Sequence, residues 1–183
     1  MNTTHRSIQV RWTKPRLSWH KLNLDGSSIG NPGWAGGGGL IRDDKGVWVK
    51  GYARNIGHTT SVAAELWALR DGLRLCSALK IPAVIIELDA KLIVDLLQKE
   101  EGHQNCIDAF VSDCKSELRA ISMVQVQHCY REVNKCADAL ARRGALLPQD
   151  FVVFLDPPME VSLLLSLDSA GWLMIVVFLF FSF

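Results

Sequence analysis

Residues 20–33 read His20-Lys-Leu-Asn-Leu-Asp25-Gly-Ser-Ser-Ile-Gly30-Asn-Pro-Gly33, and this stretch decides the fold. From His20 to Asp25 the hydropathy alternates, with Leu22 and Leu24 on one side and polar residues on the other. A period of two is typical of a strand that buries one face. Gly30-Asn-Pro-Gly33 contains the residues that favour a tight turn. The stretch therefore predicts a strand that ends at a carboxylate, followed by a turn.

Two further strands are expected directly after this turn. Residues 36–42 and 47–53 are apolar or glycine-rich, and they flank Asp43-Asp44-Lys45-Gly46. Such a polar tetrapeptide with glycine between two apolar runs indicates a β-hairpin. The first three strands are therefore predicted to form an antiparallel meander.

The hydrophobic period then changes to that of a helix, because Val62, Leu66, Leu69, Leu73 and Cys76 recur on one face until Pro82. Residues 83–88 form a nearly continuous apolar run, as expected of a strand buried on both faces and reached by a helical crossover. Further helices are predicted over about 90–99, 105–121 and 133–145, with a short strand at 123–128. This order predicts an α/β fold with a five-stranded mixed sheet, three antiparallel strands and then two parallel ones, flanked by helices.

The 183 residues suit one domain, which we expect over 19–147. Residues 1–18 are polar and interrupted by Pro15, and they are expected to be a flexible lead-in. Residues 148–183 are expected to be a poorly structured apolar tail. The apolar run 171–183 is too short to span a bilayer by itself, since about 20 residues are needed. A membrane anchor is the alternative interpretation of this tail.

The composition excludes several classes of protein. A net charge of +1 argues against a domain that holds nucleic acid by charge alone. Five basic residues near the start could contact phosphates or form part of a solvated lead-in: Arg6, Arg11, Lys14, Arg16 and Lys21. Five cysteines, an odd number without a CxxC spacing, do not support a disulfide framework or a zinc site. We expect an intracellular monomer, nuclear or cytoplasmic, without a small-molecule cofactor.

Four carboxylates are candidates for one site. Asp25 and Asp89 each end a strand, and parallel neighbouring strands would place both at the same edge of the sheet, where ligands of open α/β sheets bind. Glu65 lies on the apolar side of its helix, where a charge needs a partner. Asp138 lies on the last helix and leans toward the domain. Donors that are all oxygen suit hard cations such as Mg²⁺ and Mn²⁺.

A structural interpretation remains open for three of the four. Asp25 precedes a glycine and could form a turn, Asp89 precedes a helix and could be its N-cap, and Asp138 could be a surface charge. Glu65 has no such alternative, because caps and surfaces do not place a glutamate on the core side of a helix.

Several motifs resemble those of the type 1 ribonuclease H family. Residues 24–33 resemble its DGS-x-x-GNPG opening, Thr59-Thr60 with Glu65 its second acidic motif, and Glu87-Leu-Asp89-Ala90 its third, where the family commonly has serine in place of Ala90. The ten-residue step from His128 to Asp138, with Asn134 between them, is similar to its fourth. The resemblance covers about 12–147 and is strongest to plant members, which often derive from retroelement reverse transcriptases.

This resemblance implies endonucleolytic hydrolysis of the RNA strand of an RNA–DNA hybrid by a two-metal-ion mechanism. Asp25, Glu65, Asp89 and Asp138 would bind two Mg²⁺ ions, for which Mn²⁺ can substitute. His128 would lie on a mobile loop and transfer protons, since imidazole titrates near neutral pH. The nucleic acid would contact a further set of residues: Gly26, Ser27, Gly30, Asn31, Ser61 and Asn134.

The sequence departs from the family in its means of holding the hybrid. Bacterial members have two asparagines before the glutamate, whereas Ser61 and Val62 stand here. Residues 96–121 hold no cluster of Lys and Arg that could clamp a duplex. These departures predict weak hybrid binding with a shallow salt dependence. Two alternatives to the nuclease follow: a nucleic-acid-binding domain that has lost useful cleavage, and a retroelement remnant without a selected role.

Overall fold

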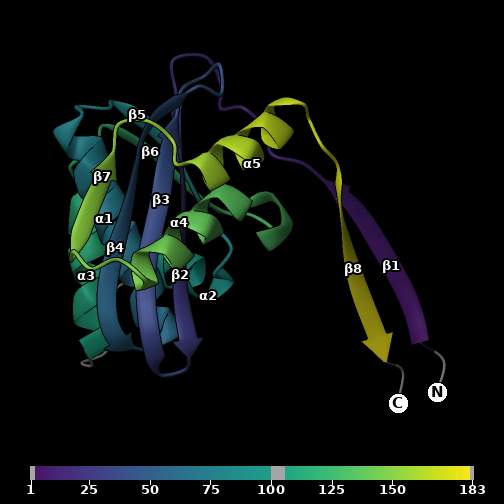
Figure 1. The fold of residues 1–183 in the computed structure, drawn as a ribbon, viewed down its shortest axis with the longest axis horizontal. Helices are drawn as coiled ribbons and strands as arrows, with labels where there is room; N and C mark the ends of the chain where they lie inside the picture. Colours follow the sequence, from purple (N-terminus) through teal and green to yellow (C-terminus); the bar gives the residue numbers. More distant parts are fainter. Residues whose placement is uncertain (1–2, 100–105, 182–183) are drawn as a thin grey trace.

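The computed structural model describes residues 3–99 and 106–181 of the chain (Figure 1). Its strands are β1 (Thr3–Val10), β2 (His20–Gly30), β3 (Gly33–Arg42), β4 (Trp48–Thr59), β5 (Ala83–Leu88), β6 (Met123–His128), β7 (Phe151–Phe154) and β8 (Met174–Phe181). Its helices are α1 (Ser61–Ala78), α2 (Lys91–Gln98), α3 (Cys106–Arg119), the 3₁₀ turn η1 (Arg131–Val133), α4 (Lys135–Ala145) and α5 (Met159–Ser169).

The main sheet has six strands in the order β6-β5-β2-β3-β4-β7. Strands β2, β3 and β4 form the antiparallel meander predicted from the sequence, and β5 and β6 continue it in parallel. The α/β class is confirmed, but the predicted number of five strands is wrong, because β7 adds a sixth, antiparallel to β4. The sequence analysis missed β7 because it is only four residues long and follows a proline in the apolar tail.

Helices cover both faces of this sheet, α1 and α3 on one side and α4 and α5 on the other (Figure 1). The core on the α1 side joins Leu22 and Leu24 of β2 to Leu66 and Leu69 of α1. Glycines in β3 allow the helices to lie close to the sheet. A Cβ atom on Gly37 would contact α1, whereas one on Gly38 would lie 2.4 Å from the backbone of α4. Successive residues of β3 thus face opposite helical layers.

The ends of the chain correct two expectations. Residues 1–18 are not a flexible lead-in throughout, because β1 pairs with β8 in a two-stranded ribbon that extends from the main body (Figure 1). Trp12 is buried against the sheet. Residues 148–183 are not a poorly structured tail, since 151–181 contain β7, α5 and β8. The physical reason is that β1 and β8 satisfy each other's backbone groups, which neither segment can do alone.

In the described parts of the chain, no helix combines the length and the apolar character needed to cross a membrane. Four cysteines are free and buried: Cys76, Cys114, Cys129 and Cys136. Burial raises the pKa of the Cys76 thiol to about 12, so this thiol remains protonated at neutral pH and is inert.

Candidate active site

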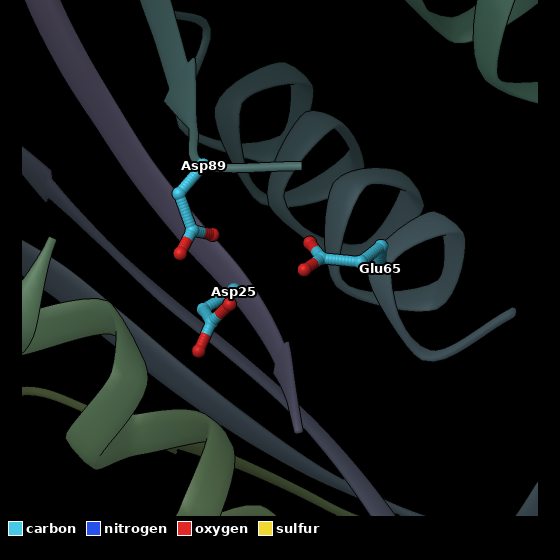
Figure 2. Close-up of side chains that lie close together, drawn as sticks. All are labelled: Asp25, Glu65 and Asp89. Atoms are coloured by element: carbon cyan, nitrogen blue, oxygen red, sulfur yellow. The ribbon is translucent and has the colours of Figure 1, made fainter. Parts of the chain in front are cut away.

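Three carboxylates from three different elements converge at one edge of the sheet (Figure 2). Asp25 lies on β2, Asp89 directly follows β5, and Glu65 comes from the first turns of α1. One oxygen from each lies within 4.8 Å of the others. The parallel register of β2 and β5, with Asn23 opposite Glu87, places the two aspartates side by side. Gly26 allows α1 to approach β2 closely, because a Cβ atom at this position would lie 2.3 Å from the backbone nitrogen of Glu65.

The charged forms of Asp25 and Glu65 are disfavoured by burial and by repulsion from the neighbouring carboxylates. Burial, followed by the charges of Asp89 and Asp138, raises the pKa of Asp25 to about 8. Burial and the charges of Asp25 and Asp89 likewise raise the pKa of Glu65 well above its usual range. The Oε2 atom of Glu65 is buried and has no hydrogen-bond partner among the described residues. Buried oxygens of this kind normally have a partner, so the cluster fits a bound cation.

The structural alternatives for the two aspartates are not supported. Asp25 lies inside β2, where it pairs with Gly38 of β3. It is five residues before the turn and therefore does not form that turn. The N-cap of α2 is Ala90, and no side chain caps this helix. Neither aspartate therefore has a local backbone role that would explain its position.

Asp138 does not join the three-carboxylate cluster. Its carboxylate accepts a hydrogen bond from Arg131 at 3.3 Å and forms an ion pair with Arg142 at 2.9 Å, and its side chain is mostly buried. It is still near enough for its charge to raise the pKa of Asp25. Of the four carboxylates predicted to form one site, three therefore converge. The fourth, Asp138, lies beside them and is held by two arginines. Neither arginine was among the predicted site residues.

His128 is the last residue of β6 and does not lie on a loop, which corrects the expectation of a mobile loop. Its register opposite Leu88 places the ring next to Asp89. The Nε2 atom lies 3.2 Å from the backbone carbonyl oxygen of Asp89, and the ring packs edge-on against Tyr130. Because a carbonyl oxygen only accepts, Nε2 is the donor in this contact, and Nδ1 takes no part in it.

The structure gives structural roles to several of the predicted nucleic-acid contacts. Asn134 is 2% exposed and donates to the carbonyl oxygen of Leu24, so its side chain cannot reach a bound duplex. The side chain of Asn31 accepts from the backbone N–H of Ser61, which fixes the turn to the start of α1. Ser27 remains half-buried at the site, and Gly30 adopts a positive φ of 88° that suits glycine.

Beneath the cluster lies a buried polar layer that the sequence analysis missed. Lys21 donates to Glu87 at 2.7 Å, and Asn23 donates to the same carboxylate at 3.0 Å. Lys21 is therefore a buried ion-pair partner, neither a phosphate contact nor part of a solvated lead-in. The available signal was Glu87, a charge inside an otherwise apolar strand.

The same layer extends to the C-terminal helix. Arg42 stacks on Trp12 at 3.5 Å and donates to Asn23 at 2.8 Å and to Asp168 of α5 at 2.6 Å. An arginine with a side chain 1% exposed thus depends on a carboxylate from the segment that the sequence analysis expected to be poorly structured.

A mixed sheet between two helical layers, with carboxylates gathered on β2, just after β5 and on α1, defines a ribonuclease H-like domain. The family described as reverse transcriptase-like matches residues 23–144, and the chain belongs to this family. A relative from Arabidopsis thaliana named "Putative ribonuclease H protein" is 36% identical over 162 residues, which cover 88% of this chain. The match spans 26% of that relative, so the chain corresponds to about a quarter of its length.

Solved structures show the same fold. RNase H1 from the archaeon Halobacterium salinarum is 24% identical with a TM-score of 0.65, over 69% of this chain and 96% of the other. LC11-RNase H1, solved in complex with an RNA/DNA hybrid, is 26% identical with a TM-score of 0.64, over 69% and 96% of the two chains. The prototype foamy virus protease-reverse transcriptase is 20% identical with a TM-score of 0.59, over 71% and 21%.

Proposed function

We propose that this domain hydrolyses the RNA strand of RNA–DNA hybrids with divalent metal ions held by Asp25, Glu65 and Asp89. The observation that carries the proposal is the convergence of three carboxylates, two of them buried, of which Glu65 has an oxygen without a hydrogen-bond partner among the described residues. The hybrid bound to LC11-RNase H1 supports the choice of substrate.

The donor set fits Mg²⁺ or Mn²⁺, because carboxylate oxygens are the ligands that these hard cations prefer. Bound Mg²⁺ supplies charge stabilisation to the attacking and leaving oxygens of the phosphodiester. The protein orients these ligands through rigid elements: β2 and α1 position Asp25 and Glu65, and the end of β5 positions Asp89. Arg131 and Arg142 hold Asp138 next to the cluster, from where we propose that it completes the ligand set.

A second candidate function is hybrid binding without useful cleavage. It is favoured by the two arginines, which occupy both carboxylate oxygens of Asp138 and hold it outside the cluster. Cleavage and binding assays separate the two functions directly.

The test is cleavage of an end-labelled hybrid with Mg²⁺, with an excess of chelator, and with Ca²⁺ in place of Mg²⁺. We expect internal cuts in the RNA strand with Mg²⁺ alone, since calcium forms longer bonds in a looser geometry. Binding of the same hybrid without any cutting would favour the second function, and cutting in excess chelator would contradict the proposed metal dependence.

Metal affinity is expected to rise with pH. In the metal-free protein the pKa of Asp25 is about 8, so below this pH a proton occupies the carboxylate that the metal needs. Binding should therefore be weak at pH 6, where it releases a proton from Asp25, and should strengthen toward pH 9, where almost no proton is released. Calorimetric titration with Mg²⁺ at several pH values measures this. An affinity that does not change between pH 6 and pH 9 would mean that Asp25 is not a ligand.

Replacing His128 with alanine is expected to slow cleavage by about 100-fold without unfolding the domain, the lower end of the range of about 10²–10⁴-fold that positioned proton transfer contributes. The control is His128→Asn, which keeps a donor for the carbonyl oxygen of Asp89 but cannot titrate. If proton transfer is the role, both variants are slow even at saturating Mg²⁺. Full activity in the asparagine variant would reduce His128 to a positioning residue.

A further inference from the structure

An aromatic and aliphatic surface lies beyond the carboxylate cluster on the same face of the sheet. Trp34 is 63% exposed and Ile29 is 66% exposed, and the two are directly opposite each other on β3 and β2. Trp34 is also opposite His58 on β4, with the rings edge-on at 6.3 Å. We refer to Ile29, Trp34 and His58 as the hairpin patch.

The register explains why this patch is exposed. On adjacent strands, Asp25 is opposite Gly38, Ser27 is opposite Gly36, and Ile29 is opposite Trp34. Alternate residues share a face, and Cβ atoms on Gly38 and Gly36 would both contact α4. Because α4 ends at Ala145, next to Gly36, it does not reach the next pair of residues on this face, Ile29 and Trp34. The hairpin patch is therefore left uncovered.

The patch is held in a fixed position relative to the cluster. The Ser28 hydroxyl donates to the carbonyl oxygen of Gly30 at 2.6 Å, and Asn31 accepts from the backbone of α1 at 3.1 Å. Ile29 is four residues beyond Asp25 on one strand, which corresponds to about 13 Å at about 3.3 Å per residue. At about 3.4 Å per nucleotide, this distance spans about four nucleotides of a bound strand.

A rigid indole at this distance can hold a nucleobase. Each base has an apolar face, so stacking on an aromatic side chain does not depend on sequence. Within a continuous duplex these faces are covered by neighbouring bases, so an indole finds no internal base to stack on, whereas an unpaired base offers its face. The patch has no carboxylate of its own to repel the strand.

We infer that Trp34 stacks on an unpaired base next to the duplex, so that the domain prefers hybrids that adjoin a single strand about four nucleotides from the carboxylate cluster. This inference rests on the proposed function, because it takes the cluster as the point at which the hybrid is held. It also offers a means of gripping the substrate in a chain whose net charge is only +1.

Binding of short hybrids to the full chain tests this inference, with Ca²⁺ in place of Mg²⁺ to prevent cleavage. The blunt hybrid is compared with four others, each with a single-stranded extension of about six nucleotides on the RNA or the DNA strand, at either end. Stacking of one base is worth roughly 5–100-fold in affinity. We expect one of the extensions to raise affinity by this factor in the unmodified protein.

In Trp34→Ala this gain should disappear, while affinity for the blunt hybrid stays within about twofold. Trp34→Phe should retain most of the gain, because it keeps an aromatic face. The matched control is Trp172→Ala, which removes a tryptophan of similar exposure, 61%, from the C-terminal segment and should retain the gain in full.

An equal gain in Trp34→Ala, or no gain from any extension in the unmodified protein, would overturn the inference. Failure of the proposed function looks different. In that case Trp34-dependent binding to the extended hybrid persists, but no RNA is cut when Mg²⁺ is restored. Cleavage of blunt hybrid without any effect of Trp34 would reject the inference and leave the proposed function intact.

Discussion

Replacing Asp25 with asparagine is expected to abolish hybrid cleavage and at the same time to make the metal-free protein more stable. Cleavage should fall by on the order of 10³-fold or more, because the variant loses a charged ligand that no neighbour can replace. The amide is nearly isosteric with the carboxylate, so the fold should not change.

The gain in stability follows from the pKa of Asp25, which is raised from 3.8 to about 8 in the folded protein. The folded state holds a proton that the unfolded chain releases near pH 4. Stability is therefore lost as the pH rises from about 4 through 8. Asparagine has no proton to lose, so the variant should be more stable by up to about 5 kcal/mol at pH 8 and no more stable at pH 4.

Thermal unfolding with chelator at both pH values, together with the cleavage assay, measures the two effects. Asp95→Asn is the matched control, because Asp95 is an exposed aspartate paired with Lys91 on α2, away from the cluster. It should change stability by less than about 0.5 kcal/mol and leave cleavage unchanged. An active Asp25→Asn variant would contradict the proposed metal site.

Replacing Asp168 with alanine is expected to destabilise the domain by up to about 3 kcal/mol, the lower end of the range for a fully buried ion pair, because the Arg42 side chain is 1% exposed but that of Asp168 is 19% exposed. Arg42 would keep its stacking on Trp12 and its hydrogen bond to Asn23 but would lose its only carboxylate partner among the described ion pairs. Its Nε atom already has no hydrogen-bond partner among the described residues, so a second group would be left unsatisfied.

Glu160→Ala is the control for this prediction. Glu160 is also on α5 and pairs with Arg143 of α4, but both side chains are nearly half exposed. Removing this pair should cost no more than about 1 kcal/mol. Urea unfolding of the two variants gives the comparison. Equal, small effects would mean that α5 is not an integral part of the domain and that residues 19–147 fold without it.

The predicted fold and cluster could be read from local patterns. The alternation at Leu22 and Leu24 and the helical period from Val62 to Cys76 fix which face of each element is buried. Glu65 was the most informative single residue, because a charge on the apolar side of a helix needs a partner. Its partners Asp25 and Asp89 then followed from the parallel order of the strands.

The remaining features depend on contacts between residues distant in sequence, and no local pattern encodes these. Asp168 is one example, since it reaches back to Arg42 on β3. Asn134 is another: a polar residue in a family motif suggested a substrate contact, but its amide is used inside the protein. Asp138 has arginines both before and after it in the sequence. Only the folded structure shows that one from each side contacts its carboxylate.

The pairing of β1 with β8 has a consequence for the order of folding. Thr3 is opposite Phe181, so this ribbon closes a loop that contains almost the whole chain. Closing so long a loop is entropically costly, and contacts of such high sequence separation form slowly. We expect the ribbon to form after the six-stranded sheet and to open before it. In hydrogen exchange, the amides of β1 and β8 should therefore be the least protected strand amides, at free energies well below that of global unfolding.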